Sequence, residues 1–95
     1  MFARLSTYQV PPERKEEAQA SFEGAVGQIR EAEGLEKAVF MLGCDSDRAV
    51  TITFWESHAA MSASRVMASR LRSDAASSVD GDVVSVDEFE VISDE

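Results

Sequence analysis

The chain has 95 residues, of which 44% are hydrophobic and 28% charged, and its 18 acidic residues against 9 basic ones give a formal net charge of -9. Such a length suits one compact core, so we expect a single domain over residues 1–95. The negative charge would repel phosphate backbones and anionic lipid headgroups, which argues against nucleic acid and membrane surfaces as partners.

The sequence offers no segment typical of a membrane span or an export signal. Its uncharged stretches, such as residues 38–44, are too short to cross a bilayer, and residues 1–5 lack a basic segment followed by an apolar run. We therefore expect a cytoplasmic protein. The lone cysteine, Cys44, cannot form an intrachain disulfide, and one cysteine with one histidine cannot build a zinc site. We expect Cys44 to pack at a strand end, and we expect no metal.

The first predicted elements are a strand over Phe2 to Val10 and a helix that begins near Pro12 and stops at Gly34. The strand mixes apolar, β-branched and aromatic residues without helical spacing. The helix is indicated by apolar residues at alternating spacings of four and three, a narrow stripe that predicts packing on a sheet: Ala18, Phe22, Ala25, Ile29 and Ala32.

Two β-rich runs, Leu35 to Cys44 and Ala49 to Trp55, are separated by short polar residues that suit a hairpin turn. Side chains alternate between the two faces of a strand, so the second run has one wholly apolar face and one mixed face. We expect the apolar face, with Phe54, to point into the helix-covered core, and Trp55 to point to the opposite face.

The last predicted elements are a second helix and a final strand. Ser57 is a suitable N-cap, and the helix that follows has a loosely apolar face. The small polar residues from Ser73 to Gly81 predict a loop, and Val83 to Ile92 predicts a strand. The order βαββαβ favours an α+β, ferredoxin-like fold, in which a four-stranded antiparallel sheet carries two helices on one face.

Such a fold leaves one sheet face uncovered. We expect Phe2, Tyr8 and Trp55 on that face, where they would form a large apolar patch on a monomer. A second copy of the sheet is the simplest cover, so we expect a homodimer that forms through the sheet faces.

At this point the sequence resembles a known family, the antibiotic biosynthesis monooxygenase-like domains of the dimeric α+β barrel superfamily. The resemblance rests on Gly34-Leu35 at the start of a strand, on the run from Val50 to Ser57 that leads into a helix, and on Ala60 in that helix. It implies a homodimer with facing sheets and a pocket in each protomer, between sheet and helices or near the barrel mouth. Known activities in such families include cofactor-independent oxygenation of aromatic phenols, oxidative haem breakdown, and isomerisation or decarboxylation of small metabolites.

The family chemistry carries over only in part. Members that cleave haem or oxygenate aromatic substrates pair a tryptophan with an asparagine, and Trp55 matches the tryptophan. This chain contains no asparagine, and its only histidine, His58, lies at the start of the second helix rather than late in it. We therefore expect no haem and no other cofactor.

For cofactor-free oxygenation, a protein must bind a phenol-like substrate, assist its deprotonation and stabilise the resulting anion. We expect Arg4 to stabilise the anion, Trp55 to act as a stacking wall and His58 as a base. The residues expected to contact the substrate are Phe2, Tyr8, Thr51 and Thr53.

Each of these residues also has a structural interpretation: Trp55 and Tyr8 as packing, His58 as a surface side chain, and Arg4 in an interface salt bridge to Glu88 or Glu90. Two functions stay in competition. One is a small oxygenase or isomerase that acts on a compact aromatic or anionic metabolite. The other is a non-catalytic dimeric binding or interaction module of the same fold.

Overall fold

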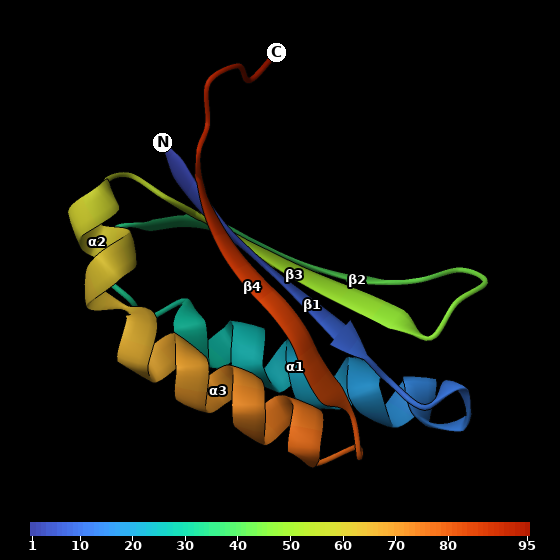
Figure 1. Cartoon of the computed structure of the whole chain (residues 1–95). Coiled ribbons are helices and arrows are strands. Elements are labelled where there is room, and N and C mark those ends of the chain that lie inside the picture. Colours follow the sequence, from blue (N-terminus) through green and yellow to red (C-terminus); the bar gives the residue numbers. More distant parts are fainter.

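The computed structural model describes residues 1–95 and contains four strands, three α-helices and one short 3-10 helix. The predicted order of strands and helices is confirmed, and Figure 1 shows how the elements follow one another in space. In chain order they are β1 (Phe2–Gln9), η1 (Pro12–Arg14), α1 (Lys15–Ile29), β2 (Leu35–Leu42), β3 (Arg48–Trp55), α2 (His58–Ala63), α3 (Arg65–Ser77) and β4 (Asp82–Glu90).

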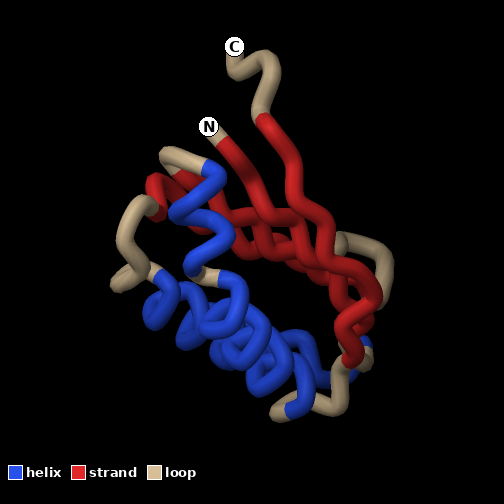
Figure 2. Tube along the Cα trace, turned by 60° about the vertical axis from the view of Figure 1, so that its left-hand side comes forward, coloured by secondary structure: helices blue, strands red, loops and turns tan.

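The four strands form one antiparallel sheet in the order β2-β3-β1-β4. β1 is central and pairs with β3 in a register that places Arg4 opposite Thr53 and Tyr8 opposite Ala49. All three α-helices lie on the same face of the sheet, and no helix covers the other face (Figure 2). The two-layer, ferredoxin-like arrangement predicted from the sequence is therefore confirmed.

The prediction of which strand faces point toward the helices was wrong. Trp55 is fully buried and packs with Ile29 and Met61, while Tyr8 packs against Phe22 of α1. Together with Phe2, which packs against the Trp55 cluster, these aromatics lie on the helix-covered side. The wholly apolar face of β3, which includes Phe54, is the one that no helix covers.

The uncovered face carries large side chains from all four strands, and several are exposed although they are apolar. Met41 and Phe89 each expose close to half of their surface. The alternation from the strand pairings assigns to this face the large apolar residues Leu5, Val39, Met41, Val50, Ile52, Phe54 and Phe89. A continuous apolar sheet face of this kind is typical of an interaction surface.

The corner between α1 and β2 explains why glycine occupies position 34. Gly34 has a φ of 84°, which favours glycine, and a Cβ atom built there would lie 2.5 Å from the Cβ of Ala60. The Gly34 carbonyl also accepts a hydrogen bond from the backbone N–H of Glu56. The start of β2 is thereby held directly against α2, with no room for a side chain.

The predicted second helix is in fact two helices that meet at Ser64. The Ser57 hydroxyl caps α2 by accepting a hydrogen bond from the Ala60 N–H, as expected. The predicted loop from Ser73 to Gly81 was wrong in its first half, because α3 continues to Ser77. Ala75 and Ala76, which look loop-like in sequence, are buried in the core around Tyr8 and Phe22.

Cys44 follows β2 in the hairpin connection and is exposed, so the expectation that it packs at a strand end was wrong. None of the helices is both long and apolar enough to span a membrane.

Candidate functional site

A cavity of about 50 Å³ lies between the sheet and helices α1 and α3. The sheet contributes polar side chains from β1 and β3, and the helices contribute a mostly apolar wall that ends at Arg72. The lining residues are Arg4, Ser6, Tyr8, Phe22, Ala25, Val26, Ile29, Thr51, Thr53, Ala68, Leu71 and Arg72. Its volume has room for a few water molecules or a small substituent, and not for a fused ring system.

The mixed face of β3 and the matching face of β1 explain how polar groups come to line a buried cavity. Ser6 lies opposite Thr51 and Arg4 opposite Thr53 in the β1–β3 register, so all four side chains point toward the helices. The Tyr8 hydroxyl is 3.0 Å from the Thr51 hydroxyl. Burial raises the pKa of Tyr8 above its ordinary value of 10.0, although hydrogen bonds to Thr51 and Ser6 act in the opposite direction. Tyr8 is therefore a neutral phenol at physiological pH.

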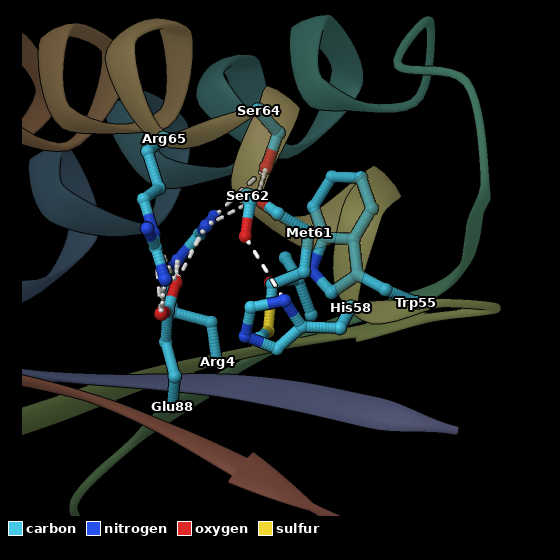
Figure 3. A network of polar contacts seen from close by, with 9 residues as sticks. Arg4, Trp55, His58, Met61, Ser62, Ser64, Arg65 and Glu88 are labelled. Carbon is cyan, nitrogen blue, oxygen red and sulfur yellow. Dashed lines mark hydrogen bonds and ion pairs between the residues drawn. The ribbon is translucent and has the colours of Figure 1, made fainter.

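Arg4 is the most strongly held charged group of the site. Its side chain is 4% exposed and donates to the Ser64 hydroxyl at 3.1 Å, to the Met61 carbonyl at 2.8 Å and to the Glu88 carboxylate at 2.9 Å (Figure 3). The Met61 carbonyl lies near the end of α2 and also accepts hydrogen bonds from the backbone N–H and the hydroxyl of Ser64. The break between α2 and α3 thus positions the guanidinium of Arg4.

Glu88 joins Arg4 to a second arginine. Arg65 of α3 donates to the same carboxylate at 2.6 Å, so one carboxylate bridges two guanidinium groups (Figure 3). Hydrogen bonds from Arg65 and Arg4 lower the pKa of Glu88 to about 2. At neutral pH Glu88 is therefore ionised and too weak a base to remove a proton from a phenol. The expected Arg4–Glu88 ion pair exists, and it forms within one chain.

Trp55 lies behind Arg4 rather than in the cavity. The Arg4 guanidinium carbon is 5.7 Å from the centre of the Trp55 ring, a cation–π distance. The indole N–H donates to the Thr53 hydroxyl at 2.9 Å, and the ring is fully buried. Trp55 therefore supports Arg4 and the cavity-lining Thr53, and it does not itself line the cavity.

A groove of about 420 Å³ between α3 and β4 adjoins this cavity. Arg4 and Arg72 line both spaces, so the groove and the cavity meet at these two residues. The groove is lined by Arg4, Arg65, Ser69, Arg72, Val86, Asp87 and Glu88. Burial lowers the pKa of Arg72, but an arginine keeps its proton at neutral pH.

His58 and Phe2 lie apart from the cavity and the groove. Their rings pack edge to face with centres 5.5 Å apart, and the exposed His58 is 3.3 Å from the Ser62 hydroxyl. The structure therefore brings together the predicted residues Arg4, Tyr8, Thr51 and Thr53, with Trp55 behind them. It does not bring His58 or Phe2 to the same place.

Sequence reasoning missed Ser64, Glu88 and Arg72 as parts of this site. Glu88 was considered only as an alternative partner for Arg4, and Arg72 was not singled out. One signal was available in the sequence. Ala68, Leu71 and Ala75 form a buried stripe at helical spacing, and Arg72 lies four residues after Ala68 and three before Ala75, which places it beside this stripe. No cluster of three or more histidine, cysteine, aspartate or glutamate residues is arranged to hold a metal ion.

The sequence model of the antibiotic biosynthesis monooxygenase (ABM) family matches residues 1–69, which is most of the chain. The chain belongs to this family. The matched part of this ABM protein includes β1, β3, α2 and the start of α3, and so the whole Arg4 network except Glu88. Among curated protein sequences, none matches the chain.

Solved structures show that the ABM protein shares its fold with several proteins of low sequence identity. A proposed antibiotic biosynthesis monooxygenase from Deinococcus radiodurans is 12% identical, with a TM-score of 0.81 over 100% of this chain and 96% of that chain. A variant of SnoaB, a cofactor-independent oxygenase from Streptomyces nogalater, is 12% identical, with a TM-score of 0.79 over 98% and 94%.

A variant of MhuD with two manganese protoporphyrin IX molecules per active site is 19% identical to the ABM chain, with a TM-score of 0.70 over 100% of this chain and 98% of that chain. The residues present here do not fit a haem group. No histidine or cysteine lines the cavity or the groove, and the cavity of about 50 Å³ is far too small for a porphyrin.

Proposed function

We propose that this ABM protein is a small-molecule enzyme, a cofactor-independent monooxygenase or isomerase that acts on a compact aromatic or anionic metabolite. The observation that carries the proposal is the cavity, in which the buried Arg4 and the neutral phenol of Tyr8 lie along one wall, opposite the apolar helix residues. A cation and a hydrogen-bond donor in a largely apolar space are suited to stabilise an enolate or phenolate.

The likeness to SnoaB, a cofactor-independent oxygenase, supports oxygenation as one form of this reaction. The substrate anion would supply the electrons that reduce O2. One oxygen atom would replace two hydrogens at the oxidised carbon, and the other would leave as water. Arg4 would stabilise the anion, and Tyr8 with Thr51 and Thr53 would orient it.

The cavity contains no side chain that is suited to act as the base for deprotonation. Glu88 has a pKa of about 2, Tyr8 keeps its proton, and His58 does not line the site. A substrate that is already ionised at neutral pH suits these residues best. This chemistry favours acidic phenols among the compact metabolites, and a carboxylate elsewhere on the substrate would contribute to binding and would not supply the electrons.

Oxygen uptake with a panel of phenols, quinols and aryl carboxylates tests the proposal. We expect uptake with at least one compound, and a reduction of tenfold or more in the Thr51→Val variant, which loses the hydroxyl that pairs with Tyr8. Thr7→Val is the matched control, because Thr7 lies on the face of β1 that points away from the helices. Equal uptake in both variants would contradict the assignment of the cavity.

A non-catalytic binding or interaction module is the second candidate function. It is favoured by the small cavity, the complete burial of Trp55 and the absence of asparagine. Saturable binding of a panel compound without turnover would support the module over the enzyme.

We also propose that the protein is a homodimer whose uncovered sheet faces meet. The seven large apolar residues of that face support this arrangement, since burying them would remove apolar surface from water. Light scattering after size exclusion tests it: Ile52→Lys should yield monomers. Val66→Lys, which changes an apolar residue of α3 that is 85% exposed, should remain dimeric.

A further inference from the structure

Arg72 differs from the other arginines of the site because it has no partner. Arg4 and Arg65 both form ion pairs with Glu88, whereas Arg72 donates no hydrogen bond to any side chain or carbonyl and forms no ion pair. Its side chain is half-buried, so part of its hydration is lost without a protein group to replace it. An unpaired, partly desolvated guanidinium is a favourable place for an anion.

The charged residues of the groove limit the negative charge that a bound ligand can carry. Three guanidinium groups line it, from Arg4, Arg65 and Arg72, and the carboxylate of Glu88 faces them. Asp87 lines the groove but lies opposite Leu5 in the sheet, so its side chain points to the uncovered face. Glu88 is already paired with Arg4 and Arg65, so one carboxylate could pair with Arg72, and a second negative charge would meet repulsion from Glu88.

The position of Arg72 indicates that the uncharged part of the ligand is apolar. Arg72 lines both the open groove and the inner cavity, and the inner wall next to it is formed by Leu71, Ile29 and Phe22. A ligand anchored at Arg72 would therefore place its uncharged part against apolar side chains. The planar guanidinium fork matches a carboxylate in geometry and can bind it through two parallel hydrogen bonds.

We propose that Arg72 is a second anion-binding residue of this protein, in addition to Arg4, and that it binds the carboxylate of a compact monocarboxylic acid whose apolar body lies in the groove with one edge at the mouth of the cavity. The inference rests on the proposed function for the location of the site and sharpens it by naming the ligand class. It adds a specificity-determining residue that is distinct from the Arg4 network.

Calorimetric titration of the whole protein with benzoate tests the inference. We expect saturable binding by the natural protein, weakened by about tenfold or more in Arg72→Gln, because a charge-assisted pair to the carboxylate is lost. Arg70→Gln is the matched control: it makes the same change on an exposed residue of the same helix, and it should bind benzoate like the natural protein. Benzamide, which keeps the ring but has no charge, should bind about equally weakly to all three proteins.

Folding of the variant is checked separately. Because Arg72 has no partner to lose, Arg72→Gln should melt at the same temperature as Arg70→Gln, and Arg72→Lys should show intermediate benzoate affinity. In the natural protein, benzoate should shift the Nε–Hε resonance of Arg72 in a nitrogen-15 NMR spectrum.

Three results would overturn the inference: no saturable benzoate binding at millimolar concentrations, equal benzoate affinity in Arg72→Gln and Arg70→Gln, or tighter binding of inorganic phosphate than of benzoate. None of them depends on turnover. A protein that binds benzoate through Arg72 and consumes no oxygen with any compound would contradict the proposed oxygenation alone.

Discussion

Replacing Glu88 by glutamine should destabilise the fold by an amount that depends on pH. The change removes the carboxylate that bridges Arg4 and Arg65 while keeping the shape of the side chain. Arg4, which is 4% exposed, would then have only uncharged acceptors, namely the Ser64 hydroxyl, the Met61 carbonyl and the amide oxygen introduced at position 88. A buried guanidinium without its counter-ion is costly, so the loss should exceed that of an ordinary surface charge.

The magnitude follows from the pKa of Glu88, which is lowered from its ordinary value of 4.5 to about 2. Each pKa unit corresponds to about 1.4 kcal/mol, so the shift sets an upper limit of about 3.5 kcal/mol. The side chain of Glu88 is 23% exposed and solvent screens its charge, so we expect a loss of about 1–2 kcal/mol at neutral pH.

The sign of the pH dependence is determined by the lowered pKa. The folded state binds the proton less readily than the unfolded state, so the stabilisation from Glu88 is complete above pH 4.5 and is lost as the pH falls toward about 2. The natural protein and Glu88→Gln should therefore differ at pH 7 and converge near pH 2.

Urea unfolding, followed through the fluorescence of the single tryptophan, Trp55, is the appropriate assay. Urea is uncharged and does not screen the ion pairs, and the protein concentration is held constant because a dimer would make stability depend on it. Glu90→Gln is the matched control, since Glu90 is an exposed residue of the same strand that forms no ion pair. The reasoning would be refuted if Glu88→Gln cost no more than Glu90→Gln at pH 7, or if its cost were the same at pH 7 and pH 3.

Three further predictions follow from single features of the structure. Gly34→Ala should destabilise the protein by about 1–3 kcal/mol, because position 34 has a positive φ and lies close to the Cβ of Ala60. Gly24→Ala, where nothing lies within 4 Å, should be neutral or stabilising by up to about 1 kcal/mol. Equal melting temperatures for the two variants would contradict this account of the corner between α1 and β2. Tyr8 is the only tyrosine, so an ultraviolet titration of the phenol should give a pKa above 10.0, and a midpoint at or below that value would show that the hydroxyl is not buried as described. Mixing the protein with hemin should produce no sharp Soret shift, since no histidine lines the cavity or the groove; a sharp shift that disappears in His58→Ala would contradict this expectation.

The order of the elements could be predicted from the sequence because the local signals agree with the fold. The stripe on α1, the cap at Ser57 and the hairpin residues each determine local structure without reference to distant contacts. The end of the second helix could not be predicted in the same way. Ala75 and Ala76 belong to α3 because they pack against the core around Tyr8, a tertiary contact that outweighs the small and polar local sequence.

The orientation of the sheet was the main error, and its cause is physical. A wholly apolar strand face is usually the core face, so Val50, Ile52 and Phe54 were assigned to the helices. In this protein the helices instead cover the mixed face, where Thr51 and Thr53 supply polar groups to a cavity. The apolar face is not covered by a helix and is available to pack against another molecule. A mixed strand face opposite helices is thus itself a signal of a buried polar site.

Most residues of the candidate site were predicted, but the face of the sheet on which they lie was not. Arg4 was expected to lie near Trp55, and it does, because strand alternation and the β1–β3 pairing follow from the sequence pattern. Tyr8 lines the same cavity as Arg4, but it pairs with Ala49 and lies at the other end of the strands from Trp55. The roles of Glu88 and Arg72 depend on how β4 and α3 approach β1, which no local pattern reveals.

The central claim is that ligands bind beneath the helices, next to Arg4 and Arg72, and not on the uncovered sheet face. Methyl NMR spectra of the protein with and without benzoate test this claim most directly. We predict shifts for the methyl groups of Ile29 and Leu71, which line the cavity, and none for those of Val50 and Ile52. Shifts confined to Val50 and Ile52 would contradict the account, because they would place the ligand on the opposite face of the sheet.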